Sequence, residues 1–149
     1  MSSGISVFYR NKYLLASFFF LLLSQSAHAD LVVESAWVKL APPAIQMSAA
    51  YMKLSNQQQQ VQVITQVSAD CCASAMLHVN KVQGDKVFME HLDQLSIPAQ
   101  SSVDLKPGEV HIMLMKPRIP LVLDTPVRIT FTFSDGSRQS VETLVKRDE

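Results

Sequence analysis

The C-terminal stretch VRITFTFSDGSRQSVETLV, Val127–Val145, has the clearest fold signal in the chain. Two runs rich in β-branched and aromatic residues, 127–133 and 138–145, flank the tetrapeptide SDGS at 134–137. Such residues favour extended strands, and an Asp-Gly pair between two such runs is typical of a tight turn. The stretch therefore predicts an antiparallel hairpin.

Upstream of this hairpin, short runs of the same kind alternate with turn residues. The sequence KPGE at 106–109 fits a type II turn, because proline fixes φ and glycine permits a positive φ. No stretch after residue 29 shows a convincing 3.6-residue apolar period, so we expect an all-β fold, an antiparallel sandwich or barrel. The expected strands are 31–40, 49–54, 61–67, 75–82, 86–92, 102–105, 109–115, 127–133 and 138–145.

The first 29 residues have the composition of a secretory signal peptide. Arg10 and Lys12 precede a short apolar run, Leu14–Leu23, and AHA at 27–29 is a small-x-small cleavage site. The run is too short to span a bilayer comfortably. We expect cleavage after Ala29, with an uncleaved anchor as the less favoured alternative. Residue 30 is Asp and not Cys, so lipid attachment there is not expected.

Residues 30–149 therefore form the expected mature domain, a periplasmic protein with no membrane span. It has 11 basic and 13 acidic residues, a net charge of −2, and no basic patch that would indicate nucleic-acid binding. Its two cysteines, Cys71 and Cys72, are adjacent, and we expect no mutual bridge because it would be badly strained. No nucleophile elbow, acid-base carboxylate pair or HExxH motif occurs, so we expect no enzymatic activity.

The segment EVHIMLM, Glu109–Met115, carries the most informative chemistry. Side chains alternate faces along a strand. One face then has Val110, Ile112 and Leu114, as a core strand would, and the other has His111, Met113 and Met115. Neighbours on that second face are roughly 6–7 Å apart, so His111 and Met113 can reach one ion between them.

A second pair of candidate ligands is His78 and Met89, and whether they share a face depends on the turn at Gly84-Asp85. With a two-residue turn, His78 faces His91 and Asn80 faces Met89, so His78 and Met89 are diagonal neighbours on one face. A three-residue loop would move Met89 to the other face.

Imidazole and thioether groups are soft, neutral ligands that suit Cu(I) and are poor for Ca²⁺ or Mg²⁺. Each residue also has a simpler interpretation. A lone His is usually a hydrogen-bonded structural residue, and a lone Met usually fills a gap in a core. The HxMxM strand can also be a core strand buried on both faces. The residues alone favour a soft-metal site as a hypothesis and leave these alternatives open.

The spacing of the four residues resembles a known motif. His78, Met89, His111 and Met113 form the pattern H-x10-M-x21-H-x-M, which is similar to that of the periplasmic copper chaperone family PCu(A)C. Flanking segments, 36–39 and 103–108, also resemble that family, and the resemblance runs from about Leu31 to Val145. It implies a cupredoxin-like, Ig-like Greek-key β-sandwich with these four residues as Cu(I) ligands. It also implies delivery of copper to a partner such as the CuA centre of respiratory oxidase.

The chain departs from that family in places. Many members have Met where this chain has Asn80. Met76, His91 and Met115 are alternative auxiliary ligands on the same face, although each is favoured as a packing or surface residue. Cys71 and Cys72 are interpreted as free or mixed-disulfide thiols, with an extra Cu(I) handle as the alternative.

Three functions remain to be separated. The favoured one is a monomeric metallochaperone. A blue-copper electron carrier needs a Cys thiolate beside two His and an axial Met, and neither cysteine lies on the motif strand. A metal-free sandwich that acts as an interaction module is the third.

Overall fold

The computed structural model describes residues 31–42 and 44–147. All nine predicted strands are present, together with a three-residue strand, β6, that was not predicted. No helix in this part of the chain is long and apolar enough to cross a membrane. The signal peptide and its cleavage after Ala29 lie outside the described residues. The strands are β1 (Leu31–Lys39), β2 (Met47–Asn56), β3 (Gln62–Ala69), β4 (Cys72–Gln83), β5 (Lys86–His91), β6 (Leu95–Ile97), β7 (Ser101–Leu105), β8 (Val110–Pro117), β9 (Pro126–Phe133) and β10 (Arg138–Lys146).

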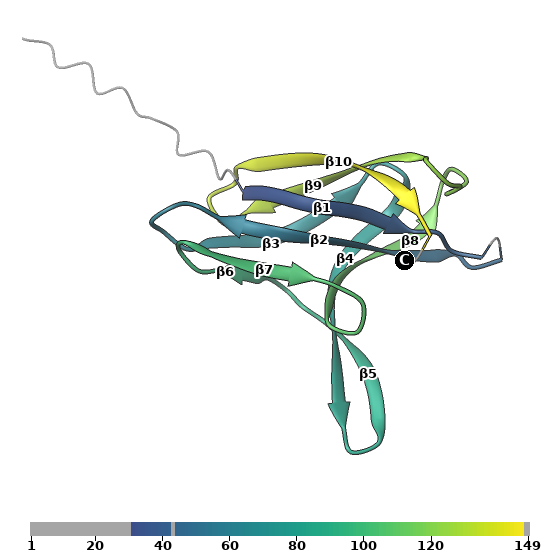
Figure 1. Ribbon diagram of the computed structural model, residues 1–149, viewed down its shortest axis with the longest axis horizontal. Helices are drawn as coiled ribbons and strands as arrows, with labels where there is room; N and C mark the ends of the chain where they lie inside the picture. The colour runs from purple at the N-terminus through teal and green to yellow at the C-terminus, as the bar shows by residue number, and fades with distance from the viewer. Residues whose placement is uncertain (1–30, 43, 148–149) are drawn as a thin grey trace, which may run out of the picture.

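The strands form one mixed sheet, shown in Figure 1. Hydrogen-bonded neighbours follow the order β5-β4-β8-β2-β1-β10-β9-β3-β6, and β7 pairs with β2. The strand pairs are antiparallel except for β1 with β10, which are parallel. β3 and β4 lie far apart along this path but contact each other. The sheet therefore folds back over a core, and the all-β cupredoxin-like class is confirmed.

The core forms from side chains that alternate along each strand. On β9, Val127, Ile129, Phe131 and Phe133 are buried, and the residues between them face outward. This period of two is the expected signature of a strand with one buried face. The largest fully buried apolar side chains include Leu54, Ile64, Ile97, Ile112, Leu114, Ile129 and Phe131.

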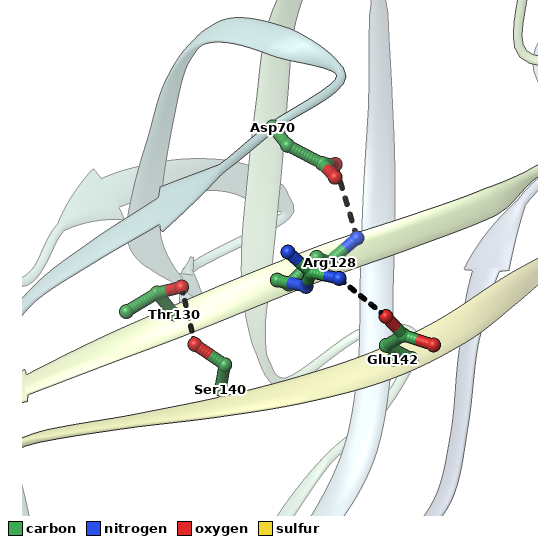
Figure 2. A network of polar contacts seen from close by, with 5 residues as sticks. All are labelled: Asp70, Arg128, Thr130, Ser140 and Glu142. Atoms are coloured by element: carbon green, nitrogen blue, oxygen red, sulfur yellow. Dashed lines mark hydrogen bonds and ion pairs between the residues drawn. The ribbon is translucent and has the colours of Figure 1, made fainter.

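The outer face of β9 and β10 consists of paired polar side chains (Figure 2). The Arg128 guanidinium donates to Glu142 Oε1 at 2.7 Å, and the Arg128 amide donates to Asp70 Oδ1 at 3.0 Å. The hydroxyls of Thr130 and Ser140 are 2.8 Å apart. These two strand-to-strand pairs are directly opposite in the register, so each polar group has a cross-strand partner.

β4 and β5 form a hairpin that projects away from the other strands (Figure 1). Gln83 pairs with Lys86, so the turn contains two residues, as one alternative predicted. Gly84 has a φ of 61°, a conformation that favours glycine and that such hairpin turns require. All six residues of β5 are exposed. The register that the two-residue turn was expected to give is therefore present.

The two cysteines correct one prediction. Cys71 and Cys72 form a disulfide with each other, and the described residues contain no free cysteine. We expected free or mixed-disulfide thiols because a bridge between adjacent cysteines would be badly strained. Cys71 lies in the turn that joins β3 to β4 and Cys72 is the first residue of β4, so the bond forms at the boundary between turn and strand. Both side chains point into the core and are 1% and 4% exposed.

Candidate metal centre

The outer face of β5, β4, β8 and β2 collects imidazole and thioether side chains from four segments of the chain. The strand registers place these residues on that face, while Ala50, Leu77, Ile112 and Leu114 point from the same strands into the core. The predicted division of β8 into a core face with Ile112 and Leu114 and an opposite face with His111, Met113 and Met115 is therefore confirmed. The residues on the outer face are Met47, Tyr51, Met76, His78, Asn80, Met89, His91, His111, Met113 and Met115.

His78 lies at the centre of three imidazole rings. It pairs with His91 on one side and His111 on the other, with ring centroids 5.6 Å and 6.2 Å away. An imidazole nitrogen lies about 2.0–2.1 Å from a bound zinc ion, so two rings that share such an ion have centroids at most about 6.4 Å apart. The separation of His78 and His111 is within that limit.

His111 is fixed in one orientation. It is 5% exposed, and its Nδ1 is 2.9 Å from the carbonyl oxygen of Glu109. Because a carbonyl only accepts, Nδ1 carries the hydrogen and Nε2 keeps its lone pair. A ligand imidazole commonly has its second nitrogen engaged in this way, which sets the tautomer and the ring orientation.

Aromatic side chains cover His111 on the β2 side. The Tyr51 ring is 6.4 Å from that of His111, and Trp37 is 4.8 Å from Tyr51. Trp37 reaches this face because β1 contains a one-residue bulge between Glu34 and Trp37, with Ser35 at a φ of 52°. The bulge reverses which residues of β1 face outward. Tyr51 and Trp37 were not predicted as site residues, since their position depends on this pairing.

His78 has an unsatisfied nitrogen. Its Nδ1 is buried and has no hydrogen-bond partner among the described residues. Burial lowers the pKa of His78, and the neighbouring His111 and His91 lower the pKa further. This shift favours the neutral imidazole, which is the form that binds metal ions.

A cavity of about 310 Å³ opens beside His111. Three of the four predicted ligands, Met89, His111 and Met113, line it, and the ring of the fourth, His78, neighbours His111. Met89 is 56% exposed on the projecting strand β5, so it is the most accessible of the four. Met47 also lines this cavity. It was not predicted as a site residue, because it precedes the expected strand 49–54 and an isolated Met there has no local signal.

The auxiliary ligand candidates lie in different surroundings; they are Met76, His91 and Met115. His91 has its Nε2 3.7 Å from Asp93 Oδ1, and it lines a separate cavity of about 410 Å³ together with Met76. Met115 is directly opposite Met47 on the neighbouring strand β2. His91 and Met76 therefore share the face of the predicted ligands but open toward another cavity.

The donor set of the 310 Å³ cavity is soft and nearly uncharged. Among the described residues that line it, Lys39 is the one charged residue and no carboxylate is present. Within 31–42 and 44–147, no group of three or more His, Cys, Asp or Glu side chains is arranged to hold a metal ion. The thioethers of Met47, Met89 and Met113, which line this cavity, are the donor type that soft ions such as Cu(I) prefer.

Comparison with known families identifies the chain. Residues 31–145 match the family described as "Putative lipoprotein LpqE-like". The chain belongs to the LpqE-like family. A putative lipoprotein of Leifsonia xyli subsp. xyli, Lxx21020, is 33% identical over 115 residues, which is 76% of this chain and 68% of that protein. An uncharacterized protein of Rickettsia prowazekii, RP573, is 31% identical over 109 residues, 68% of this chain and 56% of that protein.

Solved structures confirm the resemblance to PCuAC domains. The Cu(I) form of DR1885 from Deinococcus radiodurans has a TM-score of 0.66 and 29% identity, with 84% of each chain covered. The copper-bound PCuAC domain from PmoF2 has a TM-score of 0.67, covering 82% of this chain and 97% of that domain. Its 16% identity supports the shared fold alone. Copper is present in both of those relatives.

Proposed function

We propose that the chain is an exported copper carrier that binds one Cu(I) ion through His78, Met89, His111 and Met113. The observation that carries the proposal is the pairing of two imidazoles, each with a nitrogen available to a metal. His111 has its Nδ1 engaged with the Glu109 carbonyl, and the buried Nδ1 of His78 has no partner. A buried polar atom without a partner costs roughly 1–3 kcal/mol, so a bound ion at His78 offsets a cost that the apo fold carries.

The two thioethers complete this set from opposite sides of the cavity. Met113 comes from the central strand β8, which is paired on both sides. Met89 comes from β5, which is an edge strand and is exposed along its whole length. We infer that the ligands on β4 and β8 hold the ion in place and that Met89 is the first ligand to leave during transfer. A neutral ligand set leaves the bound ion with its positive charge, which favours release to a thiolate-rich recipient.

The surface around the cavity is suited to brief contact with such a recipient. Val82 and Val87, at the hairpin tip, are 74% and 67% exposed and face the same side as Met89. Ile45 and Met47 are exposed on the other side of the cavity. Exposed apolar side chains that border a binding site are typical of protein–protein contact surfaces. We propose that a copper-accepting protein docks here, such as the copper subunit of a respiratory oxidase, whose CuA centre the family resemblance implies.

We further propose a periplasmic location and a monomeric chain, with the signal peptide cleaved after Ala29. The LpqE-like family is described as putative lipoproteins, which supports export. Lipid attachment needs a free cysteine at the mature N-terminus, whereas both cysteines of this chain are bonded to each other at 71 and 72. Edman or mass-spectrometric analysis of the periplasmic form should find Asp30 as its first residue.

An electron carrier of the blue-copper type is the second candidate. Such a site needs a Cys thiolate as a metal ligand. Both cysteines are oxidised to a disulfide in the turn before β4, which argues against that function. A visible-absorbance scan of the Cu(II) form separates the two, since an intense blue band would require thiolate ligation.

The direct test is a Cu(I) titration of the purified chain, followed by X-ray absorption at the copper edge. We expect one tightly bound ion with two nitrogen and two sulfur neighbours. A spectrum with oxygen neighbours or without sulfur would contradict the proposal. Equilibrium dialysis that detects no copper uptake would favour the metal-free interaction module.

A further inference from the structure

Met47 and Met113 both line the cavity, and Met115 lies beside them in the β2–β8 register; of these three methionines only Met113 belongs to the proposed ligand set. We call Met47, Met113 and Met115 the thioether cluster. Met47 is directly opposite Met115 in the β2–β8 register, and Ala49 is directly opposite Met113. Opposite residues have Cβ atoms about 4.5–5.5 Å apart, and diagonal neighbours have Cα atoms about 7–8 Å apart. Met47 is therefore an immediate neighbour of Met115 and a diagonal neighbour of Met113.

The space between these thioethers is open. Ala49 has only a methyl group, so no bulky side chain separates Met47 from Met113 on this face. Methionine has three rotatable bonds beyond Cα, which lets neighbouring sulfurs converge on one point. The register thus permits three sulfur atoms to contact a single ion.

The exposure of these methionines is unusual for their residue type. Methionine most often fills gaps in cores. Of the six methionines in the described part of the chain, Met52 alone is buried in the core, at 3% exposed. Met47 is 44% exposed, and it lines both the 310 Å³ cavity and an adjoining apolar groove of about 710 Å³. Exposure therefore increases from His111, through the half-buried Met113, to Met47.

We propose that the thioether cluster is a second Cu(I) position, through which the ion passes between the His/Met site and the surface. The inference rests on the proposed function and adds a site to it. Met113 is shared by both positions, so the ion keeps its bond to that sulfur while it moves. Its bond to Met89 breaks first, its bonds to His78 and His111 then break, and bonds to Met47 and Met115 form. Copper stays in the +1 state throughout, and no proton is transferred because every ligand is neutral.

A position with thioether ligands alone binds more weakly than one that also has imidazole nitrogens. The second position should therefore fill only after the first, and while Met113 holds the first ion a second ion would bind through Met47 and Met115. Its more exposed sulfurs also make it the position from which an incoming thiolate can capture the ion. This arrangement separates storage at the buried imidazoles from release at the surface.

The test is a two-step titration with Ag(I), a soft monovalent ion that does not change oxidation state, observed through the methionine methyl signals by NMR. The first equivalent should shift the methyl signals of Met89 and Met113. The second should shift those of Met47 and Met115. Leucine replaces methionine at similar volume, so Met47→Leu with Met115→Leu should abolish the second equivalent and change the affinity of the first by no more than about threefold.

Met76→Leu is the matched control, because Met76 is opposite Met113 but opens into the other cavity. It should leave both equivalents in place. A second equivalent that survives in the Met47→Leu, Met115→Leu variant overturns the thioether cluster as a site. Saturation of the unmodified chain after one equivalent of Ag(I), with no shift of the Met47 methyl signal, also overturns the thioether cluster as a site. Absence of the first equivalent at the imidazoles overturns the proposed function instead, so the two failures are distinguishable.

Discussion

Two outer faces of the same sheet differ in how their polar side chains find hydrogen-bond partners. On β9 and β10, Arg128 pairs with Glu142 and Thr130 with Ser140 (Figure 2). On β4 and β8, the Nδ1 of His78 and the Oδ1 of Asn80 are buried without partners among the described residues. Surface strands usually satisfy their polar groups with water or with cross-strand pairs. The outer face of β9 and β10 therefore pairs these polar groups within the sheet, whereas β4 has two buried polar atoms without such partners, of which the His78 nitrogen is the one that suits a soft metal ion. A third buried polar atom without a partner among the described residues, Thr143 Oγ1, lies on β10.

The difference shows which face is specialised for a ligand. Cross-strand pairs stabilise a sheet but occupy the atoms that could bind something else. Unsatisfied buried atoms cost stability, and a fold keeps them where binding compensates. The hairpin adds to the contrast, since β9 and β10 pair along their whole length while β5 has a single strand partner, β4. The four predictions below test this contrast, from the largest expected effect to the smallest.

Removing a proposed ligand should give the largest change. We expect His111→Ala and Met113→Ala each to weaken Cu(I) binding by at least about tenfold, equivalent to about 1.4 kcal/mol. Met76→Ala and His91→Ala should change it little, because they open toward the other cavity. Competition titrations against a Cu(I) chelator measure all four. Equal effects across the four variants would contradict the ligand assignment.

Asn80→Leu should stabilise the fold. Asn80 faces Met89, and its buried Oδ1 has no partner among the described residues. Replacing this amide by an apolar group of similar size removes a desolvation cost, so we expect a gain of about 1 kcal/mol in the free energy of unfolding. Chemical denaturation measures it. Cu(I) affinity should hardly change, because an amide oxygen is a poor ligand for a soft ion. A loss of stability would mean that a bound water satisfies Oδ1.

Charges at the hairpin tip should slow copper transfer without weakening copper binding. Val82→Lys with Val87→Lys places two cations on the exposed apolar tip. We expect transfer to a thiolate acceptor to slow by about threefold, since interface substitutions act mainly on docking. Stopped-flow transfer kinetics are the measurement. The control is Val61→Lys, which is 55% exposed in the loop before β3 and should leave transfer unchanged. Equal slowing by Val61→Lys would rule out the tip as a docking surface.

The features that could be predicted from the sequence are those that depend on short stretches of residues. The nine strands follow from β-type residues between turns, and the two-residue turn at Gly84 gave the register that puts His78 and Met89 on one face. The ligand residues themselves came from a spacing resemblance, and the ligand assignment stays a prediction.

The rest depends on pairings between distant segments. The parallel contact of β1 with β10, and the bulge that turns Trp37 toward Tyr51, have no local signal. The significance of Met47 also appears only when β2 is placed beside β8. Long-range registers of this kind are not encoded in any short window of sequence. The Cys71–Cys72 bond was missed for a local reason, because a bridge between adjacent cysteines was expected to be too strained to form.

The smallest effect is expected on the β9–β10 face. Ser140→Ala removes one hydroxyl of an exposed pair and leaves Thr130 free to bond with water, so the fold should lose at most about 0.5 kcal/mol. Arg128→Ala breaks an exposed ion pair and should also leave Cu(I) affinity unchanged. Denaturation curves and Cu(I) titrations of both variants are the measurements. A change in copper binding from either would mean that the two faces are coupled through the core, because neither residue lies on the strands that carry the proposed ligands.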